Sequence, residues 1–190
     1  SWLSWLARTV KEHLANGETI TLIACRHHPA HILSYVEHID GVLPEPDRKH
    51  MVIVDAFTPS FGGDDEIFHK SLKKKEADGY TILPARSLAG IHSGTAQAFK
   101  LFKKHLPGQR IPGTVVYDGL LVYEHCEPMD HLVRFLTHMV EAERTYAMIT
   151  IMGEPVVAAE STAYGTVASL VDYVAEMDHG PVQASSMEVS

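Results

Sequence analysis

Chemically useful side chains follow directly after apolar runs at four places in the chain. These places are Cys25-Arg26-His27, Asp55, Asp118 and Gly153-Glu154. Apolar runs of this kind are typical of strands buried on both faces, and the carboxyl ends of parallel strands meet at one edge of a sheet. A carboxylate at such an edge can bind a metal ion or orient a water molecule. We therefore predict a site built from these residues.

Asp118 is the most informative of them, because it interrupts an apolar, β-branched run at 114–123. Two interpretations stay open. The residue lies at the carboxyl end of a buried strand and reaches a ligand, or it is a solvent-facing residue of an Asp-Gly turn with Gly119. Four apolar residues followed by an acid do not decide between the two.

The elements that must position these residues alternate between helix and strand patterns, which predicts an α/β fold with a mainly parallel sheet. We expect strands at 19–25, 50–57, 80–84, 114–123 and 148–152, and helices at 1–14, 29–38, 65–77, 93–106 and 127–146. Loops are expected at 42–47 and 59–65. At the C-terminus we favour a short helix at 162–170 and an antiparallel hairpin of 171–177 with 182–189 over one helix with a loose tail.

The length and composition of the chain limit the classes of function that it can have. A chain of 190 residues suits one domain, which we place at 1–177, with a hairpin strand or tail at 178–190. The net charge of −8 disfavours nucleic-acid binding, and the basic runs at 70–75 and 100–105 indicate solvated helix faces. Cys25 and Cys126 lack a paired spacing, and no signal peptide or long apolar span is found, which predicts a cytoplasmic protein outside the membrane.

The order of the motifs resembles the KaiC-like branch of the RecA-type P-loop ATPases. The matching segments are 16–22, 51–56, 115–118 and 132–154, so that the resemblance covers roughly 1–177. It implies a three-layer RecA-like fold and an oligomer, formed with copies of the chain or with other RecA-like subunits, that holds each nucleotide between neighbours. It also implies ATP and Mg²⁺ as ligands. The corresponding nucleotide-site residues are Ser1, Arg26, Asp55, Asp118 and Glu154, with Asp118 as the Mg²⁺-side acid of the Walker B strand and Glu154 as the one candidate for a catalytic role.

The departures from this family decide the expected function. The chain contains no Gly-x-x-x-x-Gly-Lys-Ser/Thr phosphate loop, and the glycine-rich run at 90–95 lacks the lysine, so we interpret it as a loop that opens into a helix capped by Ser93. Arg26 and His27 stand where KaiC-like enzymes carry paired acids. A cationic side chain cannot accept a proton from the attacking water, and its charge repels Mg²⁺. We therefore expect a degenerate regulatory or assembly module with at most weak nucleotide binding, in which Asp55 and Asp118 serve as structural caps. An active ATPase stays an alternative if a phosphate loop precedes Ser1.

Two further interpretations come from other residues. The chain has 13 histidines, and His27 and His31 form one cluster while His125 and Cys126 form another, so that a zinc-, iron- or manganese-dependent enzyme or sensor is a second hypothesis. It supposes that Cys25 faces Cys126 across the edge of the sheet. The third hypothesis is a non-catalytic interaction module, for which two tryptophans of the first helix offer either a partner surface or core packing.

Overall fold

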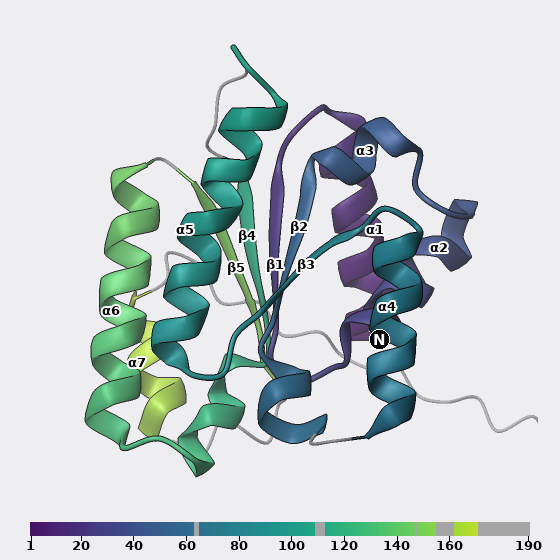
Figure 1. The fold of residues 1–190 in the computed structure, drawn as a ribbon. Helices are drawn as coiled ribbons and strands as arrows, with labels where there is room; N and C mark the ends of the chain where they lie inside the picture. The colour runs from purple at the N-terminus through teal and green to yellow at the C-terminus, as the bar shows by residue number, and fades with distance from the viewer. Residues whose placement is uncertain (63–64, 109–112, 147, 155–161, 171–190) are drawn as a thin grey trace, which may run out of the picture.

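The computed structural model describes residues 1–62, 65–108, 113–146, 148–154 and 162–170, and all statements below concern these residues (Figure 1). The elements in chain order are α1 Trp2–Ala15, β1 Ile20–Ala24, α2 Pro29–Asp40, α3 Glu45–Lys49, β2 Met51–Asp55, a π-helical turn η1 Thr58–Gly62, α4 Glu66–Ala77, β3 Thr81–Pro84, α5 Leu88–His105, β4 Thr114–Asp118, a 3₁₀ turn η2 Leu120–His125, α6 Met129–Thr145, β5 Ile149–Gly153 and α7 Thr162–Leu170.

The strands form one parallel sheet in the order β3-β2-β1-β4-β5. Helices α1, α2 and α4 cover one face of the sheet, and α5 and α6 cover the other (Figure 1). The predicted α/β fold is confirmed, and its three layers are consistent with a RecA-like arrangement. The chain leaves β1 towards β2 and β3 and then returns to β4 on the other side of β1. The switch point of the sheet, where ligands bind in such folds, therefore lies between β1 and β4.

Two apolar cores lie on the two faces of the sheet. Alternate residues of β1 point to opposite faces, so Leu22 packs with the core beside α1 and α2, whereas Ile23 packs with the core beside α5 and α6. Every residue of β1, β2 and β4 is buried. This double burial explains why their sequences are continuous apolar runs rather than alternating ones.

Helix α5 begins earlier than we predicted. It starts at Leu88, where the Ser87 hydroxyl accepts the N–H of Gly90, and Ser93 is not its cap. The glycine-rich run at 90–95 lies inside this helix, and its interpretation as a loop is wrong. A Cβ on Gly94 would lie 2.8 Å from Cγ1 of Val54, so this glycine serves close packing between the helix and the sheet.

Three other expectations need correction. The expected link at 42–47 contains the start of α3, and the expected loop at 59–65 contains most of η1. The strand predicted at 114–123 ends at Asp118, because Gly119 adopts a left-handed conformation with φ of 73° that turns the chain into η2. Helix α7 matches the helix expected at 162–170. The expected hairpin at 171–189 lies outside the described residues.

No helix in the described ranges is long and apolar enough to cross a membrane.

Candidate functional site

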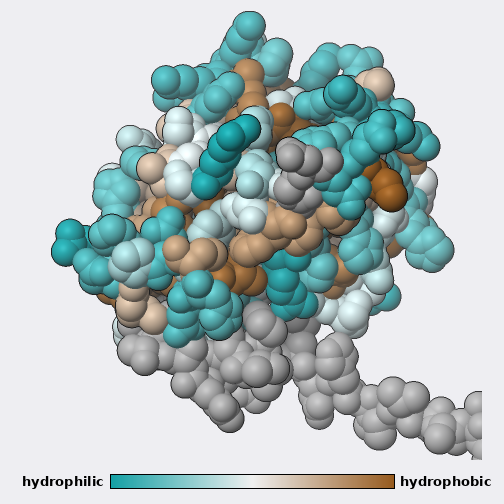
Figure 2. Space-filling view, turned by 60° about the horizontal axis from the view of Figure 1, so that its bottom comes forward, coloured by the Kyte–Doolittle hydropathy of each residue, from teal (hydrophilic) through white to brown (hydrophobic). Residues whose placement is uncertain are grey.

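The register of the sheet brings the predicted site residues to one edge. Ala24 pairs with Asp55 on one side and with Asp118 on the other, and Asp118 pairs with Gly153. The carboxyl ends of four strands are therefore level. Figure 2 is turned towards this end of the molecule and shows apolar surface among polar residues. Two distinct regions lie at this edge, which we call the Asp118 centre and the α2–α4 pocket.

The carboxylate of Asp118 is fully buried and saturated with hydrogen bonds. Its Oδ1 accepts the indole N–H of Trp2 at 2.8 Å, and its Oδ2 accepts the backbone N–H of His27 at 2.9 Å. Nδ1 of His27 lies 3.0 Å from both oxygens, and it must carry a proton to donate to them. The Asp118 carbonyl also accepts the N–H groups of Cys25 and Arg26. The solvent-facing interpretation of Asp118 is therefore wrong.

Trp2 covers this carboxylate from the first turn of α1. Ser1 caps that helix, and its side chain accepts the N–H of Ser4. The Trp2 ring lies so close to Gly153 that a Cβ there would be 2.1 Å from a ring carbon, so only glycine leaves room for the ring. The Trp2 ring also stacks on the ring of Trp5, with centroids 5.3 Å apart. The sequence indicated a core or partner role for Trp2, and nothing in it linked Trp2 to Asp118, 116 residues away.

Glu154 lies beside the Asp118 centre with an incomplete set of hydrogen bonds. Its Oε1 accepts the N–H of Leu121 at 3.1 Å, whereas its Oε2 is buried and has no partner among the described residues. Burial raises the pKa of Glu154 to about 8, and the charge of Asp118 adds to the rise, while Arg26 and backbone N–H groups oppose it. Glu154 therefore favours its protonated form near neutral pH.

Asp55 serves a local structural purpose at the end of β2. The side chain is 2% exposed, and its Oδ1 accepts the N–H of Thr58 at 2.9 Å, which begins η1. Burial raises the pKa of Asp55, and its hydrogen bonds to Thr58 offset part of the rise. Among the residues predicted around a nucleotide, Arg26, Asp118 and Glu154 are close enough to act on one another electrostatically. Asp55 instead neighbours the second region of the edge.

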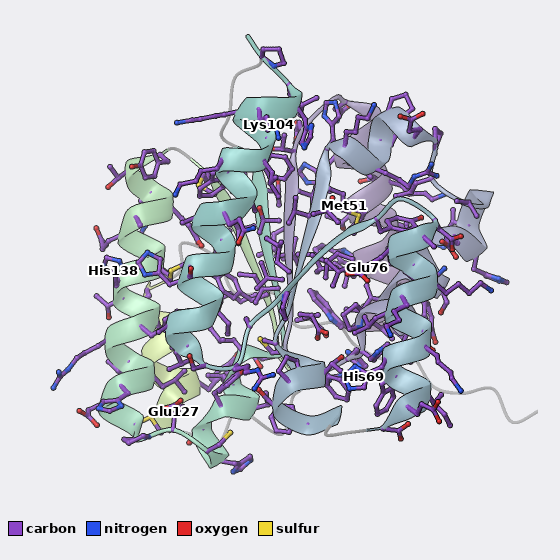
Figure 3. The ribbon with its side chains drawn as sticks, viewed as in Figure 1. Met51, His69, Glu76, Lys104, Glu127 and His138 are labelled. Atoms are coloured by element: carbon purple, nitrogen blue, oxygen red, sulfur yellow. The ribbon has the colours of Figure 1, made fainter. Side chains whose placement is uncertain are left out.

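That second region is the α2–α4 pocket, an open hollow of about 520 Å³ between the start of α2 and the start of α4. Its walls combine basic, aromatic and aliphatic side chains. The lining residues are Arg26, His27, His28, Ala30, His31, Phe57, Ile67, Phe68 and Ser71. Figure 3 labels His69 on α4 at this end of the molecule. Three of these residues, Arg26, His27 and His31, were predicted as site candidates from the sequence. The two phenylalanines were not, because they belong to no recognisable motif.

His28 forms the buried part of this pocket. Its ring stacks on Phe68 with centroids 4.8 Å apart and meets Phe57 edge-on at 6.2 Å. Its Nδ1 accepts the N–H of Ala30, which caps α2, so the neutral ring carries its proton on Nε2. Burial lowers the pKa of His28 and keeps the ring neutral, although Asp55 and the Phe68 carbonyl oppose this effect. Nε2 is buried, and the Phe68 carbonyl interacts with it without reaching the geometry of a full hydrogen bond.

The predicted metal ligands do not converge. His27 and His31 are neighbours, with ring centroids 5.9 Å apart, but the Nδ1 of His27 is engaged by Asp118. Cys126 is exposed at the end of η2, whereas Cys25 is buried in the core beside α5 and α6. Across the described parts of the chain, no group of three or more His, Cys, Asp or Glu side chains is placed to hold a metal ion. The metal hypothesis therefore has no ligand set in these residues.

Comparison with known proteins gives no family assignment. Models of protein families produced no match to this chain, and the curated proteins produced none either. Function must therefore be inferred from the geometry of the edge.

Proposed function

We propose that this chain is a RecA-fold, KaiC-like module that has lost ATP hydrolysis and acts as a regulatory or assembly subunit in the cytoplasm, with at most weak nucleotide binding. The observation that carries the proposal is the saturated state of Asp118. Trp2 and His27 already occupy the carboxylate that would hold Mg²⁺ in an active relative. Exchange of these internal donors for a cation requires both residues to move.

The neighbours of Asp118 also disfavour metal-assisted hydrolysis. Magnesium requires near-ideal octahedral oxygen ligation and is held by ionised carboxylates. Glu154, the acid that directly follows β5 beside this centre, favours its neutral form, with a pKa of about 8. The side chain of Arg26 adds positive charge beside the same carboxylates. The residues of the Asp118 centre thus suit a hydrogen-bond network that stabilises the fold better than they suit a magnesium site.

A thermal-shift titration with ATP and Mg²⁺ tests this proposal, since a ligand that binds only the folded state raises the melting temperature by mass action. We expect the unfolding free energy to rise by less than about 0.4 kcal/mol at roughly 1 mM MgATP, which corresponds to a Kd of about 1 mM or weaker. Trp2→Phe retains an aromatic ring and removes the donor to Asp118, so it should lower stability by about 1 kcal/mol without creating a response to MgATP.

An active ATPase would give a different pattern. The melting temperature would rise steeply with MgATP, and Asp118→Asn, which keeps the shape of the side chain, would abolish that rise. Phosphate release measured on the same samples would confirm turnover. Either an Asp118-dependent rise in melting temperature or phosphate release would overturn the proposal of a degenerate module. A rise with zinc, iron or manganese alone, reversed by chelator, would instead support the metal hypothesis.

The assembly part of the proposal draws on α1. Trp5 is 40% exposed, and it stacks on the tryptophan that covers Asp118. A partner that buried Trp5 would therefore be coupled to the Asp118 centre through the ring of Trp2. We expect Trp5→Ser to weaken self-association, measured by sedimentation velocity over a range of concentrations. Tyr146→Ser, at a residue that is 65% exposed after α6, is the control. A wild-type protein that is monomeric at every concentration would exclude the homo-oligomer and leave only assembly with other RecA-like chains.

A further inference from the structure

The α2–α4 pocket adjoins the Asp118 centre and shares Arg26 and His27 with it, whereas the rest of its lining plays no part in the proposed function. The Asp118 centre is built from His27, the ends of β4 and β5 and the start of α1, and the pocket opens between α2 and α4, beside the end of β2. Its volume of about 520 Å³ falls in the range of small-molecule sites, which is roughly 300–1,000 Å³. The pocket is therefore large enough for a ligand of its own.

The walls of the pocket are apolar and held in place by ring contacts. Phe57 and Phe68 meet edge-on with centroids 5.8 Å apart, and both contact the ring of His28. Ile67 lies at the open side and is 72% exposed. Aromatic contacts of this kind hold side chains in defined rotamers, so the apolar surface is ready before a ligand arrives. Such walls suit an aromatic or aliphatic body.

The pocket lining carries the positive charge of Arg26 and no acid, in contrast to the net charge of −8 for the whole chain. Three histidines and Ser71 add polar groups to the lining, and the ring of His28 is neutral. The pocket also lies at the amino end of α2, a helix of 12 residues, where the helix dipole favours negative charge.

The acids nearest to the pocket are already engaged. Asp65 caps α4 by accepting the N–H of Ile67, and Glu66 pairs with Lys70 at 2.9 Å. Asp55 is buried and accepts the N–H of Thr58. Their negative charge is therefore partly neutralised by local partners. Arg26 lines the pocket wall and also acts on Glu154, and since Glu154 favours its protonated form, that acid does not balance the guanidinium charge, which can meet an external anion.

His28 adds an incompletely satisfied polar group behind the pocket wall. Its Nε2 is buried and interacts with the Phe68 carbonyl only outside the geometry of a full hydrogen bond. A poorly satisfied buried donor costs free energy, so a small shift of the ring towards a ligand oxygen would be favourable. The Arg26 guanidinium, this imidazole and the apolar walls together point to a ligand that has both an apolar body and an oxygen-bearing anionic group.

From these observations we propose that the α2–α4 pocket binds a small amphiphilic anion, in which an aromatic or aliphatic body carries a carboxylate, phosphate or sulfonate. The body contacts Phe57, Phe68 and Ile67, and the anionic group faces Arg26 and the imidazoles.

A pair of fluorescent probes distinguishes recognition of the apolar body from recognition of the anionic group. 1-Anilinonaphthalene-8-sulfonate carries an aromatic body and an anion, and N-phenyl-1-naphthylamine carries the same body without charge. We expect one sulfonate probe to bind per native chain, with a Kd below about 100 μM, a free energy near 5.5 kcal/mol. Arg26→Gln should weaken the sulfonate probe about fivefold, the effect of a partly exposed ion pair, and leave the neutral probe unchanged. Ile67→Ser should weaken both probes.

Arg134→Gln is the matched control, because Arg134 lies on α6 and its side chain is 80% exposed. Near-UV circular dichroism and the melting temperature of each variant show that the native fold is retained, since the sulfonate probe also binds partly unfolded chains. Octanoate should displace the probe from the wild-type protein, and octanol should displace it less well. Equal binding by the Arg26 and Arg134 variants would overturn the proposal. So would loss of the neutral probe in Arg26→Gln, or the absence of sulfonate binding by the wild-type protein.

Discussion

The two regions at the carboxyl edge of the sheet use similar residue types in opposite ways. In the Asp118 centre, a buried carboxylate is met by an indole N–H, a backbone N–H and an imidazole, and a tryptophan ring covers it. In the α2–α4 pocket, a buried imidazole N–H is incompletely satisfied, and Arg26 and histidines line an open hollow. An acid at the end of a parallel strand is therefore not sufficient evidence for a ligand site. What distinguishes the two regions is whether the protein itself already satisfies the polar groups.

Asp118→Ala provides the strongest test of this comparison. The substitution leaves two buried N–H donors and the His27 ring without an acceptor, so we expect a loss of about 3 kcal/mol in unfolding free energy, measured by urea denaturation. A carboxylate that is kept for ligand binding behaves differently, because functional residues are often held at a cost in stability. Unchanged or increased stability in this variant would show that Asp118 is reserved for a ligand after all.

Gly153→Ala tests the cover over the same carboxylate. The added Cβ would overlap the Trp2 ring and must displace it, which should cost about 2 kcal/mol and shift the tryptophan fluorescence to longer wavelength. Gly165→Ala is the matched control, because no described atom outside the backbone of α7 itself lies within 4 Å of a Cβ at that position. The control should gain up to about 1 kcal/mol from helix propensity. Equal stability of the two variants would contradict the close packing of Trp2.

Glu154→Gln tests the acid that is held neutral beside the centre. The folded protein keeps the Glu154 proton up to a pH of about 8, whereas the unfolded chain releases it near its ordinary pKa of 4.5. The wild-type protein should therefore lose stability from this group as the pH rises through that interval. We expect the stability of the variant relative to the wild type to rise by about 4 kcal/mol between pH about 5 and pH about 8.5. Parallel stability curves of the two proteins against pH would refute the raised pKa.

His31→Ala tests a residue that lines the α2–α4 pocket. Of the four substitutions in these tests, it should have the smallest effect on stability. The His31 ring is exposed and contacts only the rings of His27 and Tyr35 among the ring contacts described, at 5.9 and 5.4 Å. We expect a change within about 0.5 kcal/mol by urea denaturation, as for other surface positions. A loss above 1 kcal/mol would indicate that the pocket, like the Asp118 centre, is part of the structural framework.

Local patterns in the sequence were sufficient for most of the elements. The helices and strands follow from apolar periodicity and from caps such as Asp65, whose side chain accepts the N–H of Ile67 as expected for the start of α4. The pattern failed at α5, because glycine signals a loop when only neighbouring residues are considered. Here Gly94 is required by Val54, which is 40 residues away in the sequence and belongs to another strand.

The site was determined by the sequence only in part. Apolar runs that end in Cys25, Asp55, Asp118 and Gly153 identified the edge at which chemistry could occur, because strand periodicity and parallel topology are local and general rules. The availability of each group depended on long-range contacts that have no signature in the chain. The indole of Trp2 reaches Asp118 across 116 residues, and the stacking of His28 on Phe68 joins α2 to α4. The sequence alone determined which polar groups meet at the edge, and only the tertiary structure decided which of them are closed off and which stay open to a ligand.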